Sequence, residues 1–122
     1  MRVTLYGAGA IGCYLAAHLA EVPGIDLSVI ARGETLAAIR RHGVRLVSAH
    51  GEKRSAVRAT DHPASLPVQD VVFITLKAHQ VEDALDGIAA LLGPETVILP
   101  PTTGLPWWYF HTRGERKLPR LD

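Results

Sequence analysis

Three glycines close to the amino terminus have the spacing of a loop that binds dinucleotides. Gly7, Gly9 and Gly12 follow the mostly apolar residues 3–6, which are typical of a short strand. In such a loop the first glycine permits a tight turn, the second lets the backbone approach a pyrophosphate, and the third lets the following helix lie close to the strand. The free N–H groups at the start of that helix favour a phosphate. A strand pattern before the motif and a helical pattern after it make nucleotide binding the expected chemistry.

Arg32 is a second candidate binding residue, because it follows the mostly apolar residues 27–30 of a second predicted strand. Many chains that bind NAD have an acidic residue at this place, where it binds the adenine ribose, whereas Ile30 and Ala31 are apolar. A basic residue there suits the additional phosphate of NADP. A surface arginine in a loop is the alternative interpretation. Glu34 could still bind the ribose, although an acidic residue in the first turn of a helix needs no function.

Lys77 is a third candidate, because it follows the apolar residues 71–75, which predict a buried parallel strand. Open α/β sheets bind ligands at the carboxyl ends of their strands. Lys77 could therefore contact a cofactor phosphate, a ribose or a substrate carboxylate, or it could be an exposed charge in a loop. His79 is a weaker candidate further along the same loop. The six histidines and the single cysteine, Cys13, form no metal-binding motif, so no metal is expected.

The elements that must position these residues alternate between strand and helix patterns. Apolar runs predict strands over residues 3–6, 27–30, 71–75 and 96–99. Apolar spacing and stop signals predict helices over residues 10–22, 34–42 and 81–92. Such alternation predicts parallel βαβ units with right-handed crossovers. The first helix is expected to place a ridge of small residues on the sheet, flanked by apolar ones: Gly12, Ala16 and Ala20, with Ile11, Leu15 and Leu19.

Residues 44–47 and 56–59 interrupt this order with alternating side chains, which predict an antiparallel ribbon in place of a helix. The expected fold class is therefore α/β, a Rossmann-like, doubly wound and mostly parallel sheet with an antiparallel ribbon insertion. We expect residues 1–110 to form one dinucleotide-binding domain of the Rossmann type. Residues 111–122 are expected to form a polar, basic tail that is a linker or a truncated segment.

Length and charge narrow the class of protein further. A chain of 122 residues is long enough for one domain with a substantial core. A net charge of +1 gives no reason to expect nucleic acid or a membrane surface as a partner. No stretch is long and apolar enough to span a bilayer. The single cysteine fits a reducing compartment. We therefore expect a soluble, cytoplasmic protein that binds a small molecule and could form a homo-oligomer.

Four segments together resemble the ketopantoate reductase (2-dehydropantoate 2-reductase) family: residues 7–12 (GAGAIG), 31–33 (ARG), 75–80 (TLKAHQ) and 104–110 (GLPWWYF). The glycine motif is common to many dehydrogenases, whereas the lysine and tryptophan segments are much more specific. The resemblance covers essentially the whole chain but only the amino-terminal part of such an enzyme. It implies reduction of 2-dehydropantoate, an α-keto acid, to pantoate with NADPH, a step toward pantothenate.

The resemblance also implies the roles of individual residues. Residues 7–12 would hold the pyrophosphate, Arg32 the 2′-phosphate, and Lys77 would face the cofactor near its reacting end. Thr103 stands where the family has an asparagine that contacts both the nicotinamide ribose and the substrate. The implied cofactor-binding residues are thus Gly7, Ala8, Gly9, Ala10, Ile11, Gly12, Arg32, Lys77 and Thr103, and Thr103 is also the implied substrate-binding residue.

The family's helical second domain, which carries the catalytic lysine, is absent from this chain, so no catalytic residue is assigned. We therefore expect an NADP-dependent oxidoreductase represented by its cofactor-binding domain, and inactive as this chain alone. A non-catalytic or degenerate NADP-binding module that lacks the substrate domain is the alternative.

Overall fold

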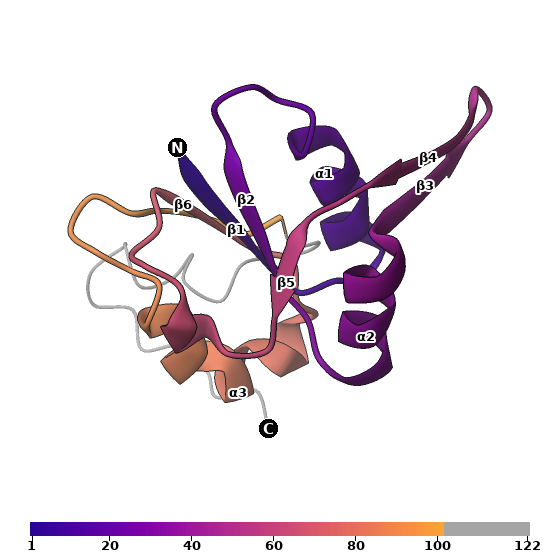
Figure 1. Cartoon of the computed structure of the whole chain (residues 1–122). Helices are drawn as coiled ribbons and strands as arrows, with labels where there is room; N and C mark the ends of the chain where they lie inside the picture. Colours follow the sequence, from indigo (N-terminus) through magenta and orange to yellow (C-terminus); the bar gives the residue numbers. More distant parts are fainter. Residues whose placement is uncertain (102–122) are drawn as a thin grey trace, which may run out of the picture.

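The computed structural model describes residues 1–101, in which a five-stranded parallel sheet carries helices on both faces (Figure 1). The sheet contains β1 (Arg2–Tyr6), β2 (Asp26–Ile30), β5 (Arg58–Thr60), β6 (Val71–Ile74) and β7 (Val97–Leu99). The helices are α1 (Ala10–Leu19), α2 (Gly33–His42), the short 3₁₀ helix η1 (Pro63–Ser65) and α3 (Ala78–Ala89). A separate antiparallel pair is formed by β3 (Val44–Ser48) and β4 (Gly51–Ser55). The predicted α/β class with a mostly parallel sheet and a ribbon is confirmed.

The strand order β5-β2-β1-β6-β7 places β1 in the centre of the sheet. The chain passes from β1 through α1 to β2 on one side, and β6 pairs with β1 on the other side. Tyr6, the last residue of β1, is in register with Ile30 of β2 and Ile74 of β6. The three strands therefore end at the same edge, at the point where the order reverses, which is where sheets of this kind bind ligands.

Two hydrophobic cores fix the helices on the sheet. On one face, Val3, Leu5 and Val29 pack with the buried residues of α1 and α2. On the other face, Tyr6 and Val72 pack with the buried residues of α3. Because neighbouring residues of a strand point to opposite faces, β1 contributes to both cores. Residues of β1, β2 and β6 are thus packed into these cores just before the candidate residues.

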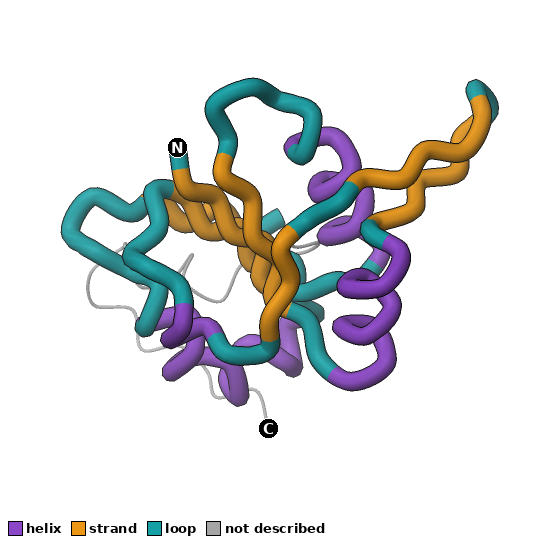
Figure 2. Tube along the Cα trace, viewed as in Figure 1, coloured by secondary structure: helices purple, strands orange, loops and turns teal. Residues whose placement is uncertain are grey.

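The antiparallel ribbon is present, but its predicted second strand is wrong. The strand that pairs with β3 is β4, whereas Arg58–Thr60 joins the main sheet parallel to β2. The alternation in residues 56–59 arises because Ala59 points into the core at 8% exposure. The residues of β4 are mostly exposed and polar, since the ribbon projects away from the sheet (Figures 1 and 2). The sequence of β4 therefore lacks the apolar alternation by which a strand is predicted.

The first helix is shorter than predicted and buries a different set of residues. It ends at Leu19 instead of residue 22, and its buried residues are Gly12, Ala16 and Ala17. The predicted ridge is wrong at Ala20, which is exposed, and the predicted apolar face is wrong at Ile11, which is 54% exposed. Small side chains let α1 lie close to the sheet, and this orientation turns Ile11 outward.

Among residues 1–101, no helix is long and apolar enough to cross a membrane.

Candidate functional site

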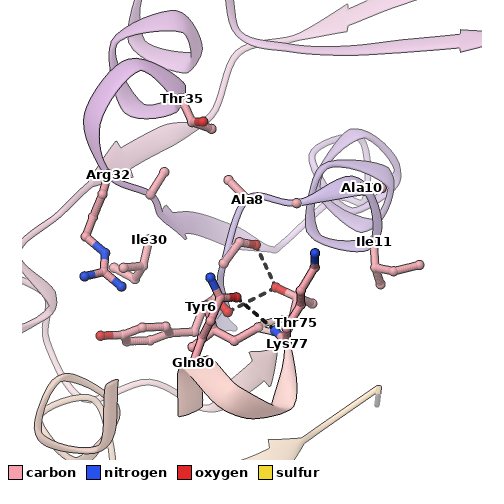
Figure 3. Close-up of a pocket in the computed structure, with 14 residues that line it drawn as sticks. Tyr6, Ala8, Ala10, Ile11, Ile30, Arg32, Thr35, Thr75, Lys77 and Gln80 are labelled. Atoms are coloured by element: carbon pink, nitrogen blue, oxygen red, sulfur yellow. Dashed lines mark hydrogen bonds between the residues drawn. The ribbon is translucent and has the colours of Figure 1, made fainter. Parts of the chain in front are cut away.

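A pocket of about 480 Å³ opens where β1, β2 and β6 end (Figure 3). Its lining comes from three segments that are far apart in the sequence. They are residues 6–11 at the end of β1, residues 30–32 with Thr35 at the end of β2, and residues 75–77 with Gln80 after β6. The structure therefore brings residues 7–11 of the glycine motif, Arg32 and Lys77 together in one pocket, whereas Gly12 does not line it. His79 and Glu34 do not line it, and Thr103 lies outside the described residues.

The three glycines of the motif meet three different physical requirements. Gly7 has a φ of 120°, a conformation that side chains rarely adopt. At Gly12 a Cβ atom would lie 2.0 Å from the carbonyl oxygen of Gly7, so only a glycine lets α1 approach the loop. Gly9 has an ordinary φ of −76°, and no heavy atom lies within 4 Å of the place of its Cβ. The fold therefore explains Gly7 and Gly12, whereas Gly9 leaves space open at the pocket.

The first turn of α1 directs free backbone N–H groups toward this space. The first hydrogen bond of the helix runs from the N–H of Cys13 to the carbonyl oxygen of Gly9 at 2.9 Å. The preceding N–H groups, of Ala10, Ile11 and Gly12, consequently have no acceptor within the helix. The first turn contains no acidic side chain. This end of α1 is electrostatically suited to an anion.

Arg32 lies at the opposite side of the pocket, directly before α2. Its backbone is extended, and Gly33 then has a φ of 55°, which opens the first turn of the helix. Figure 3 shows the guanidinium group of Arg32 above the phenol ring of Tyr6. Burial raises the pKa of Tyr6, and the positive charge of Arg32 opposes this increase. Tyr6 therefore remains a neutral phenol beside the cation.

Lys77 precedes α3 on the third side of the pocket. The N–H of Lys77 donates to Oε1 of Gln80 at 3.1 Å, and the N–H of Gln80 donates to the carbonyl oxygen of Lys77 at 2.8 Å. These two bonds fix the turn that presents the lysine, because they satisfy backbone groups at the helix start. Lys77 and Arg32 are the charged residues of the described lining, which includes no carboxylate. The pocket is therefore positively charged.

Cys13 and the histidines within residues 1–101 do not line this pocket. The thiol of Cys13 lies 3.3 Å from the carbonyl oxygen of Ala8, and burial raises its pKa. A raised pKa keeps the thiol protonated and unreactive. Within residues 1–101, no three side chains of His, Cys, Asp or Glu gather closely enough to hold a metal ion.

The amino-acid sequence matches the family model "Ketopantoate reductase PanE/ApbA" over residues 3–105. This chain belongs to the ketopantoate reductase family. It is 48% identical over 114 residues to a 2-dehydropantoate 2-reductase of Mesorhizobium japonicum, which covers 93% of this chain and 35% of that protein. A 2-dehydropantoate 2-reductase of Pyrococcus horikoshii is 33% identical over 86 residues, which cover 70% of this chain and 28% of that protein. The chain spans about a third of the length of these relatives.

Solved structures of this family have the same fold. A structure assigned to the ketopantoate reductases, from Ralstonia solanacearum, superimposes with a TM-score of 0.85 at 41% identity, over 94% of this chain and 37% of that one. A D-mandelate dehydrogenase solved with NADH and anilino(oxo)acetate has a TM-score of 0.72 at 24% identity, over 87% of this chain and 35% of that one. This second likeness concerns the fold alone.

Several lining residues were not singled out from the sequence. They are Tyr6, Ile30, Ala31, Thr35, Thr75, Leu76 and Gln80. Thr75, Leu76 and Gln80 belong to the segment 75–80 that carries the family resemblance, so that segment held a usable signal. Tyr6 lines the pocket because of the register of β1, and Thr35 because of the orientation of α2. No local sequence pattern predicts either feature.

Proposed function

We propose that this chain is the cofactor-binding part of an NADPH-dependent reductase that converts 2-dehydropantoate to pantoate. One observation carries this proposal. The pocket at the carboxyl edge of the sheet is lined by residues 7–11 of the glycine motif together with Arg32 and Lys77, and its described lining contains no carboxylate. A dinucleotide phosphate is an extended polyanion, so a pocket with two cations and a free helix start suits it. Membership of the ketopantoate reductase family supplies the reaction class.

The residues present fit such a cofactor. Gly9 leaves open the space into which a side chain would project, as close approach of a pyrophosphate requires. In our proposal residues 7–12 hold the pyrophosphate, Arg32 holds the 2′-phosphate, and Lys77 lies toward the reacting end. Thr103, outside the described residues, would contact the nicotinamide ribose and the keto acid. NADPH would supply the hydride, and the chain would supply orientation and charge.

Arg32 is the basis for preferring NADPH to NADH. The D-mandelate dehydrogenase with the same fold was solved with NADH, so the fold by itself does not select the additional phosphate. Selection must come from the residues after β2, where this chain has Arg32 and no carboxylate at positions 30 and 31. Thr35 lines the pocket one helical turn beyond Arg32 and adds a hydroxyl group to the same region.

Direct titration of the chain with NADPH and NADH tests this assignment. A hydrogen bond to a charged group contributes about 1.5–3 kcal/mol, so Arg32→Ala should weaken NADPH binding about tenfold to a hundredfold and leave NADH nearly unchanged. Arg41→Ala is the matched control, because Arg41 is an exposed arginine in α2, the helix that Arg32 precedes, and does not line the pocket. An equal loss for both cofactors would exclude Arg32 from the 2′-phosphate.

Turnover is expected to need more than this chain. Hydride transfer to a carbonyl requires a proton donor for the developing alkoxide, and loss of a positioned general acid costs about 10²–10⁴-fold. The chain spans 35% of the length of its Mesorhizobium japonicum relative, and we assign the proton donor to the remainder of such a protein. Oxidation of NADPH with 2-dehydropantoate should be at least a hundredfold slower than with that full-length relative. A rate within tenfold of the relative contradicts this part of the proposal. Failure to bind either dinucleotide would favour a degenerate module.

A further inference from the structure

The hydroxyl group of Thr75 ties the glycine loop, residues 7–12, to the end of β6. Oγ1 of Thr75 donates to the carbonyl oxygen of Gly7 at 2.7 Å (Figure 3). It also lies 3.1 Å from the carbonyl oxygen of Tyr6, which already accepts the N–H of Thr75 at 3.0 Å. A threonine hydroxyl has one proton to donate, and the contact with Gly7 is the shorter. The bond to Gly7 is therefore the principal one.

Gly7 is the residue of the loop that most needs such a bond. Its φ of 120° is accessible because it has no side chain, and the same property gives its backbone wide conformational freedom. The N–H of Gly7 is held by the carbonyl oxygen of Ile30 at 3.1 Å. Thr75 holds the carbonyl group of Gly7, and the planar peptide bond then fixes the direction of the N–H of Ala8. Two neighbouring strands thus fix both sides of Gly7.

The first turn of α1 closes the space around this bond. A Cβ atom at Gly12 would lie 2.0 Å from the carbonyl oxygen of Gly7 and 3.0 Å from Oγ1 of Thr75. The hydroxyl group therefore lies between the strand end, the loop and the helix. Loss of the hydroxyl would deprive the Gly7 carbonyl of a partner in a closely packed place, and such a carbonyl favours another orientation.

We propose that Thr75 is a positioning residue for the cofactor. Its hydroxyl group keeps the glycine loop in the orientation in which the N–H groups after Gly7 face the pocket. This inference rests on the proposed function, because it concerns the loop that we assign to the pyrophosphate. The pyrophosphate is common to NADPH and NADH, so the effect of Thr75 must be the same for both, unlike that of Arg32.

Binding by Thr75→Val tests this proposal, because the substitution exchanges the hydroxyl for a methyl group of similar size. We expect the Kd values of NADPH and NADH to rise by the same factor, about tenfold. Thr75→Ser keeps the hydroxyl and should restore binding to within about threefold of the original chain. Thr96→Val is the matched control, since Oγ1 of Thr96 also donates to a carbonyl oxygen, that of Gln69, at 2.7 Å but outside the pocket. It should lower the Tm and leave both Kd values unchanged.

A folded Thr75→Val protein with unchanged Kd values for both cofactors would overturn the proposal. If the original chain binds neither dinucleotide, the proposed function fails, and amide hydrogen exchange without ligand then decides the role of Thr75. Thr75→Val should speed exchange at Gly7 and Cys13, whose N–H groups donate to the carbonyl oxygens of Ile30 and Gly9, relative to both the original chain and Thr96→Val. Equal exchange at these residues in all three proteins would remove Thr75 from a positioning role.

Discussion

Gly87 of α3 makes room for the phenol of Tyr6, and this contact permits a sharp test of how the pocket floor is packed. Tyr6 ends β1 and is 7% exposed. A Cβ atom at Gly87 would lie 2.1 Å from the hydroxyl oxygen of Tyr6, 3.2 Å from Cζ of the same ring and 3.1 Å from Cγ of Pro63. The hydroxyl oxygen is therefore the atom that forbids a side chain at this point of the helix.

Two opposing contributions determine how Gly87→Ala changes the free energy of unfolding. Overpacking costs about 1–3 kcal/mol, whereas alanine stabilises a helix interior by about 0.5–1 kcal/mol relative to glycine. We expect a net loss of roughly 0.5–2 kcal/mol from the free energy of unfolding. Tyr6→Phe removes the oxygen and leaves contacts of 3.1 and 3.2 Å, which need shifts of only a few tenths of an ångström. In that background the substitution at Gly87 should be neutral or stabilise the fold by up to about 1 kcal/mol.

Urea unfolding followed by circular dichroism, applied to the original chain, the two single variants and the double variant, measures this coupling. The four free energies form a cycle whose interaction term should be about 1–3 kcal/mol in favour of the double variant. For a domain of this size, each kcal/mol corresponds to a Tm shift of about 4–8 °C. If Gly87→Ala destabilises both backgrounds equally, the hydroxyl oxygen of Tyr6 does not limit the helix and the packing argument is wrong.

Further predictions concern the glycine loop and the ribbon. Gly12→Ala should lower both the Tm and dinucleotide binding, because its Cβ would lie 2.0 Å from the carbonyl oxygen of Gly7. Gly9→Ala should keep the Tm, because its Cβ meets no heavy atom within 4 Å. It should nevertheless weaken dinucleotide binding, because the added methyl group occupies the space that we assign to the pyrophosphate. Thermal melts and cofactor titrations that do not separate the two variants in this way contradict the assignment. The hydrogen bond from Arg45 lowers the pKa of Glu52. The stabilisation from this pair is therefore fully present at a pH above the ordinary pKa of a glutamate. It is lost as the pH falls through the lowered pKa of Glu52. Arg45→Ala should return the pKa of Glu52 toward its ordinary value in an NMR titration, and an unchanged pKa would refute that cause.

The elements around the site were predictable where a local signal defines them. The apolar run that predicts a strand over residues 71–75 became β6, which ends at Ile74. Gly43 has a φ of 73° and ends α2 at His42, as the sequence predicts. The second strand of the ribbon was not predictable in the same way. Its side chains face solvent on a projecting hairpin, so selection for apolar alternation does not act on them.

The site was predictable to the extent that single segments carry a motif. The glycine motif, Arg32 and Lys77 each follow a strand, and parallel pairing of those strands brings the segments to one edge. The bond between Thr75 and Gly7 was not predictable, because it joins residues 68 positions apart and depends on the register of β1 and β6. The fit of Tyr6 against Gly87 likewise depends on how α3 lies on the sheet.

The features that the fold does not explain are the strongest indication of a ligand at this edge. Gly7 is required by its φ of 120°, and Gly12 by the approach of α1, so both would be glycine in a fold with no ligand at all. Gly9 meets neither requirement, and Arg32 and Lys77 are exposed cations with no core to fill. These three residues nevertheless line one pocket from three segments. An anionic ligand would account for all three at once, whereas neither backbone strain nor core packing requires any of them.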